Sequence, residues 1–330
     1  MTVSPERSSG LIATFYSYKG GVGRSMALAN VAVLLARWGS KVLVVDWDLE
    51  APGIERYFEE MAPGCHEEVR EKRGIVDIAD GLTKGIEGDW AESIVKLPVL
   101  GIGGGIDLIS AGRRDAGYVQ RLQRLDWDGL FTGHDFGHRL EVMRDDWRKT
   151  YDYILVDSRT GITDIGGICT IYLPDVLVAM FTANHQSVEG VAEVVSRARR
   201  ARSKLPVDRG ALVCIPVPAR DESRSEYQQS VEWRGIYHEL LSDFYADFLP
   251  KNVSSEDALD LLRIPSVPFW SFGERLPVLT ESAADPSKIT YYYTILARLL
   301  ATDLSWPDST SSQQARQNRV VIGDAARIRG

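Results

Sequence analysis

Short apolar runs alternate along this chain with longer segments in which apolar residues recur every three or four positions. The runs have the length of β-strands, and several are apolar throughout, as expected when both faces of a strand are buried. They lie at residues 11–17, 41–47, 107–110, 153–156, 176–181 and 211–216. Helical spacing occurs at residues 25–37, 114–125, 139–148, 187–204 and 287–304. Strands that alternate with helices predict an α/β fold, a doubly wound and mostly parallel sheet with helices on both faces.

The order of these elements predicts one domain with two insertions. We expect residues 1–10 to be an N-terminal extension and residues 11–304 to form a single domain. Residues 59–150 are polar and helical apart from one short strand, and residues 220–262 are charged and helix-rich, so both are expected to be helical insertions. Residues 305–330 are polar and rich in arginine, which predicts a mobile basic tail.

Composition narrows the classes of protein that the chain can be. Of its 330 residues 44% are hydrophobic and 25% are charged, and 46 acidic against 38 basic residues give a formal net charge of −8. These values exclude a disordered chain and argue against a body that binds polyanions over its whole surface. No secretory signal is visible, and no apolar run approaches the ~20 residues that span a bilayer. We therefore expect a cytoplasmic protein.

The cysteines agree with this location. They lie far apart and form no C-x-x-C pair, which excludes a zinc ribbon or a cysteine-bridged iron–sulfur site within one chain. Such a set suits a reducing compartment. The three cysteines are Cys65, Cys169 and Cys214.

A glycine-rich segment joins the first predicted strand to the first predicted helix. Residues 18–25 read YKGGVGRS, and the glycines allow backbone N–H groups to cradle phosphate oxygens at the start of a helix. Arg24 would supply positive charge to the outer phosphates, and the Ser25 hydroxyl is placed to bind Mg²⁺. The alternative is a tight turn without a ligand, against which the three glycines, two cations and serine argue. The predicted nucleotide-binding residues are Lys19, Gly20, Gly21, Val22, Gly23, Arg24, Ser25 and Met26.

Carboxylates follow two of the predicted strands. Asp46, Asp48 and Glu50 alternate at the end of residues 41–47, so an extended chain would turn all three to one side. Another apolar strand ends at Asp157, a pattern that is weak alone but stronger after a phosphate loop. Carboxylates beside such a loop can hold Mg²⁺ or orient an attacking water. Solvated carboxylates at strand ends are the alternative, which fits Glu50 better than Asp48.

KGGVGRS together with VLVVDWDLEAPG resembles the deviant Walker A ATPases related to MinD and ParA. Their motif is usually K-G-G-x-G-K-[ST], so this chain has Arg24 where a second lysine is common and Tyr18 where a small residue is common. The resemblance implies ATP and Mg²⁺ as cofactors and a homodimer that closes around ATP, in which Lys19 reaches the phosphates bound by the partner subunit. It makes Lys19 and Asp48 the catalytic residues. The implied Mg²⁺ ligands are Ser25, Asp48 and Asp157.

The resemblance also points to a second switch loop and to a base site. After Asp157 the sequence SRTG keeps the family's glycine, and Arg159 and Thr160 could sense the γ-phosphate; a pairing of Arg159 with a nearby acid is equally open. The adenine should lie between the loops after residues 211–216 and 265–269. Prolines at strand ends are also ordinary loop formers. The candidate base contacts are Pro216, Pro218, Arg220 and Pro268.

Other signals fit structural interpretations better than functional ones. Cations at residues 197–204 complement the end of a predicted helix, so a solvated face is favoured over a nonspecific DNA-binding patch, which stays open. The tail has no bulky aromatic residue, which argues against membrane binding. Residues 291–293, three tyrosines inside a helical pattern, are expected to pack, and His134 and His138 are expected to lie in a loop.

These residues predict a slow, Mg²⁺-dependent ATPase switch. It would be monomeric without ATP and dimeric with it, and its output would be binding to an unidentified protein partner or surface. One alternative is an ATP-dependent ligase or synthetase on the same scaffold, with a substrate pocket built from the insertions. Another is a module that binds nucleotide, barely hydrolyses it and acts in a signalling or defence complex, which Arg24 favours more than a lysine would.

Overall fold

The computed structural model describes residues 9–304, apart from residues 87, 98–102, 162–166, 206–208, 247, 251–252 and 303. The predicted tail at residues 305–330 and most of the N-terminal extension, residues 1–8, lie outside the described residues. Within the described part, no helix combines the length and the hydropathy that crossing a bilayer requires.

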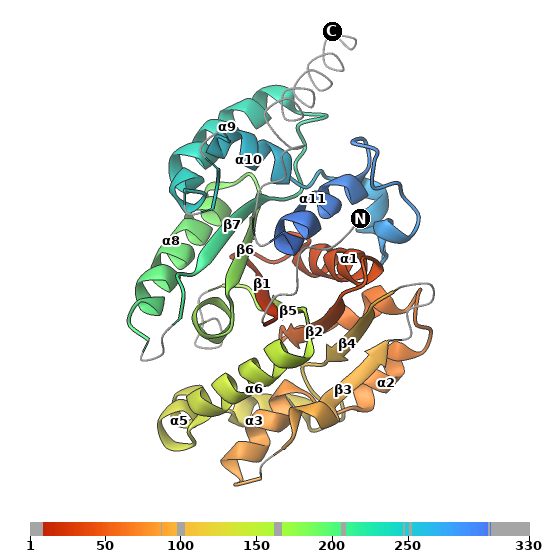
Figure 1. The fold of residues 1–330 in the computed structure, drawn as a ribbon, viewed down its shortest axis with the longest axis vertical. Helices are drawn as coiled ribbons and strands as arrows, with labels where there is room; N and C mark the ends of the chain where they lie inside the picture. The colour runs from red at the N-terminus through yellow and green to blue at the C-terminus, as the bar shows by residue number, and fades with distance from the viewer. Residues whose placement is uncertain are drawn as a thin grey trace.

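The described strands form one seven-stranded sheet through the middle of the molecule (Figure 1), in the order β3-β4-β2-β5-β1-β6-β7. Neighbouring strands are parallel except at one edge, where β3 pairs antiparallel with β4. This arrangement confirms the doubly wound, mostly parallel sheet that the sequence predicts. The strands are β1 (Leu11–Ser17), β2 (Lys41–Trp47), β3 (Ile94–Leu97), β4 (Gly105–Ile109), β5 (Tyr153–Ser158), β6 (Val176–Phe181) and β7 (Val213–Pro218).

Helices cover both faces of the sheet (Figure 1). Side chains alternate along each strand, so Val42 and Val44 of β2 join a core with α1, α8 and α11, whereas Leu43 and Val45 join a core with α3, α5 and α6. The helices are α1 (Arg24–Arg37), α2 (Cys65–Glu71), α3 (Ile75–Thr83), α4 (Tyr118–Arg124), α5 (Trp127–Gly133), α6 (Phe136–Thr150), α8 (His185–Arg202), α9 (Tyr227–Leu241), α10 (Ser255–Leu262) and α11 (Ile289–Ala301). Shorter turns are 3₁₀ at η1 (Ile54–Phe58), η2 (Trp90–Ser93), η4 (Ser242–Phe244), η5 (Pro268–Ser271) and η6 (Pro277–Leu279), and π at η3 (Ile168–Tyr172).

The register of the central strands brings three strand ends together. β1 lies between β5 and β6, and Phe15 of β1 stands opposite Asp157 of β5. β2 pairs with the other side of β5, and its Asp46 also stands opposite Asp157. Because these strands are parallel, the loop after β1 and the carboxylates after β2 and β5 meet at one edge of the sheet.

Three strands have the bounds that the sequence predicts, and the others differ in ways that affect the site. Residues 11–17, 41–47 and 176–181 are strands as predicted. The strand predicted at residues 211–216 begins and ends two residues later, as β7, because Cys214–Pro218 are all buried. The tyrosines at residues 291–293 are buried in α11, which confirms that they pack.

The first insertion, residues 59–150, corrects two expectations. It holds two strands rather than one, because Val95 and Leu97 of β3 are buried and the strand pairs with β4. His134 caps α5 and His138 lies in α6, so the expected loop is wrong there.

The reason is an aromatic contact that the local sequence does not reveal. The ring of Phe136, the first residue of α6, lies edge-on to Phe131 and Trp127, with centroids 5.3 and 5.8 Å apart. This packing outweighs the poor helix propensity of Gly137.

Candidate nucleotide-binding site

The glycine-rich loop connects β1 to α1 with a backbone that requires glycine at two positions. Gly21 and Gly23 have φ angles of 73° and 92°, in the left-handed region where other residues are strained. A Cβ atom added at either would meet no atom within 4 Å, so these glycines serve the backbone conformation rather than close packing. In α1 the Ala27 amide donates to the Gly23 carbonyl at 3.0 Å. The amides of the first turn, before Ala27, are those that an anion at a helix N-terminus would accept from.

Arg24 joins the start of α1 to both carboxylates that the sequence singles out. Its Nε donates to Asp157 Oδ1 at 2.5 Å, and its Nη2 donates to Asp48 Oδ2 at 2.7 Å. The Ser25 hydroxyl donates to the other oxygen of Asp157, Oδ2, at 2.5 Å. The structure therefore brings the predicted Mg²⁺ ligands together, but with the Arg24 guanidinium between the two carboxylates.

Burial shapes the charges in this cluster. The exposed fraction is 7% for the Arg24 side chain, 2% for Asp157 and 18% for Asp48. Burial by itself lowers the pKa of Arg24, but the charges of Asp157 and Asp48 outweigh it and raise that pKa. Burial raises the pKa of Asp48, with the charge of Asp157 adding to it and Arg24 opposing it. The cluster thus holds its cation tightly.

Asp46, one of the three alternating carboxylates, binds backbone amides rather than Arg24. Its two oxygens accept hydrogen bonds from the backbone amides of Asp48 and Gly53, both at 3.1 Å. Burial, followed by the charges of Asp157 and Glu55, raises its pKa well above the ordinary value. Asp46 therefore anchors the turn that carries Asp48, and the alternation of Asp46 with Asp48 was the signal that could have identified it.

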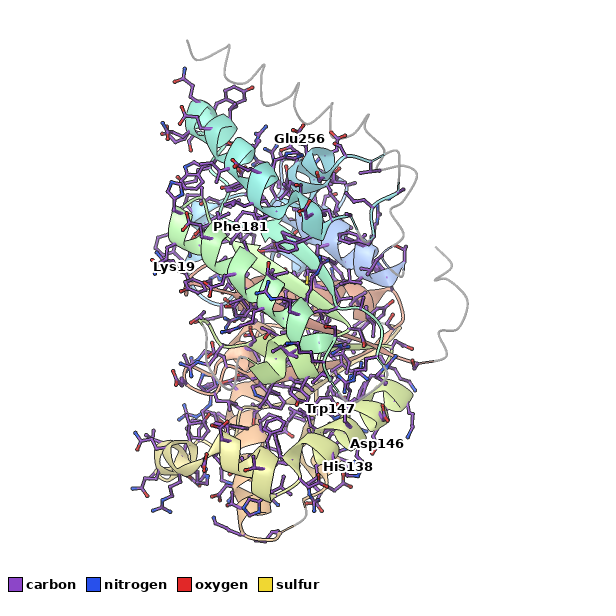
Figure 2. The ribbon with its side chains drawn as sticks, turned by 90° about the vertical axis from the view of Figure 1, so that its left-hand side faces the viewer. Lys19, His138, Asp146, Trp147, Phe181 and Glu256 are labelled. Carbon is purple, nitrogen blue, oxygen red and sulfur yellow. The ribbon has the colours of Figure 1, made fainter. Side chains whose placement is uncertain are left out.

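Tyr18, two residues before Gly20, packs against α8. A Cβ atom at Gly190 of α8 would come within 2.4 Å of the Tyr18 ring, so that glycine makes room for the tyrosine. The next residue, Lys19, is half-buried and lies at the left-hand edge of the molecule in Figure 2. Among the described residues no carboxylate forms an ion pair with Lys19. The loop thus keeps one cation outside the Arg24 cluster.

The loops after β2 and β5 are joined by an ion pair. Arg159 Nη2 donates to Glu50 Oε2 at 2.6 Å. Of the two roles left open for Arg159, the structure contains the pairing with a nearby acid. The Glu50 side chain is 55% exposed, so the pair is accessible to solvent.

The predicted base site lies where two loops are adjacent. Pro216 and Pro218 are buried inside β7 rather than following it, so the loop begins later than expected. Asp221 forms an isolated bridge with Pro265, which brings the two predicted loops side by side. Arg220 and Pro268 are exposed there. Their contact with a base remains a prediction.

Tyr57 of η1 is half-buried and is not among the residues that the sequence singles out. Burial raises its pKa to about 12, with the charges of Glu274 and Asp157 adding to that effect. Arg24 and Arg220 act on it in the opposite direction. Charges of both the Arg24 cluster and Arg220 thus act on Tyr57, and a lone tyrosine in a polar segment gives no sequence signal of this.

The cations at the end of α8 do not form one open patch. Arg202 is 6% exposed, and its Nη1 donates to the Ile171 carbonyl at 2.6 Å. Arg199 lies over the Phe244 ring, 5.1 Å from its centroid. Arg200 is exposed. The structure thus uses part of this cationic run for internal contacts.

An open groove of about 770 Å³ lies beside the loop that carries Asp48. Its wall is formed by Ala51 and Pro52 of that loop and by α4 and α5 of the first insertion. The Tyr118 hydroxyl of α4 donates to the Leu49 carbonyl at 2.7 Å, so the groove is tied to the loop.

The donor set fits Mg²⁺ only together with further oxygens. No group of three or more His, Cys, Asp or Glu side chains in the described part of the chain could hold a metal ion by itself. Ser25, Asp48 and Asp157 supply hard oxygen donors, which Mg²⁺ prefers, and Mg²⁺ commonly completes its shell with water and phosphate oxygens. The residues therefore fit a nucleotide-bound Mg²⁺, provided that Arg24 is accommodated.

Comparison with known proteins gives similar sequences and folds. The septum site-determining protein MinD of Helicobacter pylori is 23% identical over 207 residues, 62% of this chain and 66% of that protein. An ATP-binding protein of Methanocaldococcus jannaschii is 38% identical over 69 residues, 20% of this chain and 26% of that protein. The chain thus matches less than two thirds of the length of these two curated relatives.

A solved structure shows the same fold. MinD from Pyrococcus horikoshii, complexed with Mg-ADP, superposes with a TM-score of 0.58 at 17% identity, covering 87% of this chain and 94% of that one. The family model of the CobQ/CobB/MinD/ParA nucleotide binding domain matches residues 13–263. This range contains the glycine-rich loop, strands β2 and β5, and both Asp48 and Asp157. The chain therefore belongs to the CobQ/CobB/MinD/ParA nucleotide-binding domain family.

Proposed function

We propose that this chain is a Mg²⁺-dependent ATP switch that hydrolyses ATP slowly, dimerises around the nucleotide and then binds a partner protein or surface. Residues 11–304 would act as one ATPase domain with two insertions. The observation that carries the proposal is Lys19, a cation of the phosphate loop without an ion pair among the described residues. Membership of the MinD/ParA family supports ATP as the nucleotide.

Lys19 is not needed to bind phosphates within its own chain. The loop amides, the start of α1 and a bound Mg²⁺ already provide positive potential there. A lysine at the edge of the loop is useful if it reaches a nucleotide across a two-fold axis. There it would offset the charge that develops on the transferred phosphoryl group. Dimerisation and hydrolysis would then require the same residue.

Each remaining residue of the site has a distinct role in this proposal. The loop amides of residues 20–26 hold the phosphates, and Asp48 orients the attacking water and accepts its proton. Ser25, Asp48 and Asp157 would hold the Mg²⁺, which would neutralise phosphate charge when bound. Arg220 and Pro268 lie at the loops proposed to contact the base.

Light scattering of the purified protein with ADP, ATP and a slowly hydrolysed ATP analogue tests the proposal. The parental chain should be monomeric with ADP and dimeric with ATP. Lys19→Ala should bind ATP almost normally, remain monomeric and lose most hydrolysis. Arg200→Ala, an exposed cation on α8, is the matched control and should dimerise like the parent. An ATP-dependent dimer of Lys19→Ala with the parental hydrolysis rate would exclude a lysine that acts across the dimer.

Mixing two inactive variants sharpens this test. Lys19→Ala chains keep an intact Asp48, and Asp48→Ala chains keep an intact Lys19. A mixed dimer would contain one complete site, so a mixture of the two should regain part of the parental hydrolysis. Without regained activity, Lys19 and Asp48 would have to act in the same chain.

A second candidate function is an ATP-dependent ligase or synthetase, which the groove of about 770 Å³ favours. Its volume lies in the range of small-molecule sites, and it adjoins the loop that carries Asp48. Such an enzyme would hydrolyse or transfer phosphate faster when a small metabolite is present. A metabolite screen of ATPase rate, with Tyr118→Phe to loosen the groove from the Leu49 carbonyl, would separate the two functions.

A further inference from the structure

The Arg24 side chain turns back into the protein instead of extending over the open phosphate loop. Only 6% of the residue is exposed, and its guanidinium bonds to Asp157 and Asp48 at 2.5 and 2.7 Å. Asp157 is at the same time the acceptor of the Ser25 hydroxyl. Each of the three side chains that would ligate Mg²⁺ is therefore already engaged within this cluster.

A guanidinium suits this position better than the lysine that is common there. Two nitrogens on one edge of the planar group each reach a different carboxylate, which a single ammonium point charge does with less directed geometry. The cross-link connects segments that are distant in sequence, since Asp48 and Asp157 lie 24 and 133 positions from Arg24. Arg24 thus holds the ends of β2 and β5 against the start of α1.

Mg²⁺ and the guanidinium compete for the same oxygens. A divalent cation bound to Asp48, Asp157 and Ser25 would lie next to a like charge in a site from which water is largely excluded, where repulsion is poorly screened. The Ser25 hydroxyl would also have to turn its lone pair toward the metal and give up its bond to Asp157. Both groups cannot keep their present contacts.

We infer that Arg24 is a built-in counter-cation that takes the place of Mg²⁺ in the nucleotide-free site, so that Mg²⁺ binds only when Arg24 is displaced toward the phosphates. The inference rests on the proposed function for the location of the Mg²⁺ site. It makes Arg24 a positioning residue that couples metal binding to nucleotide binding. The negative phosphates provide the new partner that the guanidinium needs when it leaves the carboxylates.

Metal binding without nucleotide tests this inference directly. Mn²⁺ serves as the probe, and the free ion is measured by electron paramagnetic resonance in a titration of the nucleotide-free protein. Arg24→Met vacates the carboxylates, so it should bind Mn²⁺ about tenfold or more tightly than the parent. The same variant should gain about 3 °C in melting temperature in millimolar Mg²⁺, whereas the parent should gain little. Equal Mn²⁺ binding by the two proteins would overturn the inference.

Two further variants keep the result specific. Arg24→Met combined with Asp157→Asn should lose the gained Mn²⁺ binding, because the vacated site then lacks a charged ligand. Arg200→Met, which removes an exposed arginine, should bind Mn²⁺ like the parent. If Arg24→Met does not fold, Arg24→Lys carries the test, with a smaller gain in the same direction expected and no gain contradicting the inference.

The test separates this inference from the proposed function because it uses neither nucleotide nor dimerisation. A protein that gains Mn²⁺ binding on Arg24→Met but never dimerises with ATP would refute the switch and keep the counter-cation. A protein that dimerises with ATP but shows no gain would refute the counter-cation alone.

Discussion

Two buried clusters of arginine and carboxylate lie at opposite ends of the parallel strands, and they differ in which charge is in excess. At the carboxyl ends, Arg24 bonds two carboxylates, Asp48 and Asp157. At the amino ends, Arg144 bonds Asp175, which precedes β6 and also accepts from the Ile12 amide of β1 at 3.0 Å. The first cluster has an excess of acids and the second an excess of arginines.

The second cluster holds backbone rather than a ligand. Arg144 and Arg202 donate to the carbonyls of Leu173 and Ile171 at 3.1 and 2.6 Å, and Arg209 donates to the carbonyl of Tyr172. These carbonyls belong to η3 and the residue after it. Basic side chains at the end of a helical turn satisfy its unpaired carbonyls and complement its dipole. This cluster therefore fixes the segment that follows the loop after β5.

The pKa values of the arginines follow this difference in charge. The carboxylates around Arg24 raise its pKa despite burial. Burial lowers the pKa of Arg202 to about 10, and the charge of Arg209 adds to this effect. Burial also lowers the pKa of Arg144. The charge of Asp175 opposes that shift, and the charges of Arg209 and Arg148 add to it. The amino-end arginines divide their bonds between backbone carbonyls and the carboxylates of Asp175 and Glu141, whereas both bonds of the Arg24 guanidinium go to carboxylates. Excess negative charge thus distinguishes the cluster at the carboxyl ends of the strands from the one at the amino ends.

Loss of a guanidinium from the amino-end cluster should have the largest effect on stability. Arg144→Ala should lower the free energy of unfolding by about 3 kcal/mol, because Asp175 loses its buried cation and the Leu173 carbonyl loses the donor Arg144. Urea unfolding at pH 7 measures this. Arg148→Ala is the matched control, because the Arg148 side chain is 28% exposed and lies 4.0 Å from the same carboxylate. It also donates to the Gly10 carbonyl and the Ser9 hydroxyl at 2.8 and 2.7 Å, so its loss should cost about 1 kcal/mol. Equal losses in the free energy of unfolding would mean that Arg144 stabilises the fold no more than Arg148 does.

A change in the carboxyl-end cluster should instead affect hydrolysis. Asp48→Asn keeps an acceptor for Arg24 but removes the charge that would orient and deprotonate water. We expect ATP hydrolysis to fall about 100-fold, while nucleotide affinity changes little and the free energy of unfolding stays within about 1 kcal/mol of the parent. Steady-state phosphate release and calorimetry measure the two quantities. Parental hydrolysis by Asp48→Asn would remove this carboxylate from the chemistry and weaken the contrast between the clusters.

The smallest effect should come from the exposed ion pair between the two loops at the site. Glu50→Gln removes the charge partner of Arg159 in a pair whose acidic side is 55% exposed. Exposed pairs contribute about 0–1 kcal/mol, so the free energy of unfolding should fall by less than about 1 kcal/mol. Comparison of thermal unfolding at low and high salt measures it. A loss of unfolding free energy as large as that of Arg144→Ala would show that an exposed ion pair stabilises this protein as much as a buried one.

Several features of this protein follow from its sequence alone. The runs at residues 11–17, 41–47 and 176–181 are strands with the predicted bounds, because an unbroken apolar run is a local signal that a buried strand imposes. The glycine spacing of residues 20–23 likewise predicts a turn that needs left-handed backbone, as Gly21 and Gly23 have. Propensity and periodicity act between near neighbours, so local sequence is enough for both.

Only the tertiary structure decided where the charged side chains point. Arg24 was expected to face the phosphates, but it lies between two carboxylates that reach it only when the ends of β2 and β5 meet beside α1. The pKa values of Asp46 and Tyr57 are raised in a similar way, by burial and by the charge of Asp157 on a strand that is distant in sequence. Ion pairing depends on the contacts and the dielectric environment that folding creates, and neither can be read from positions along the chain.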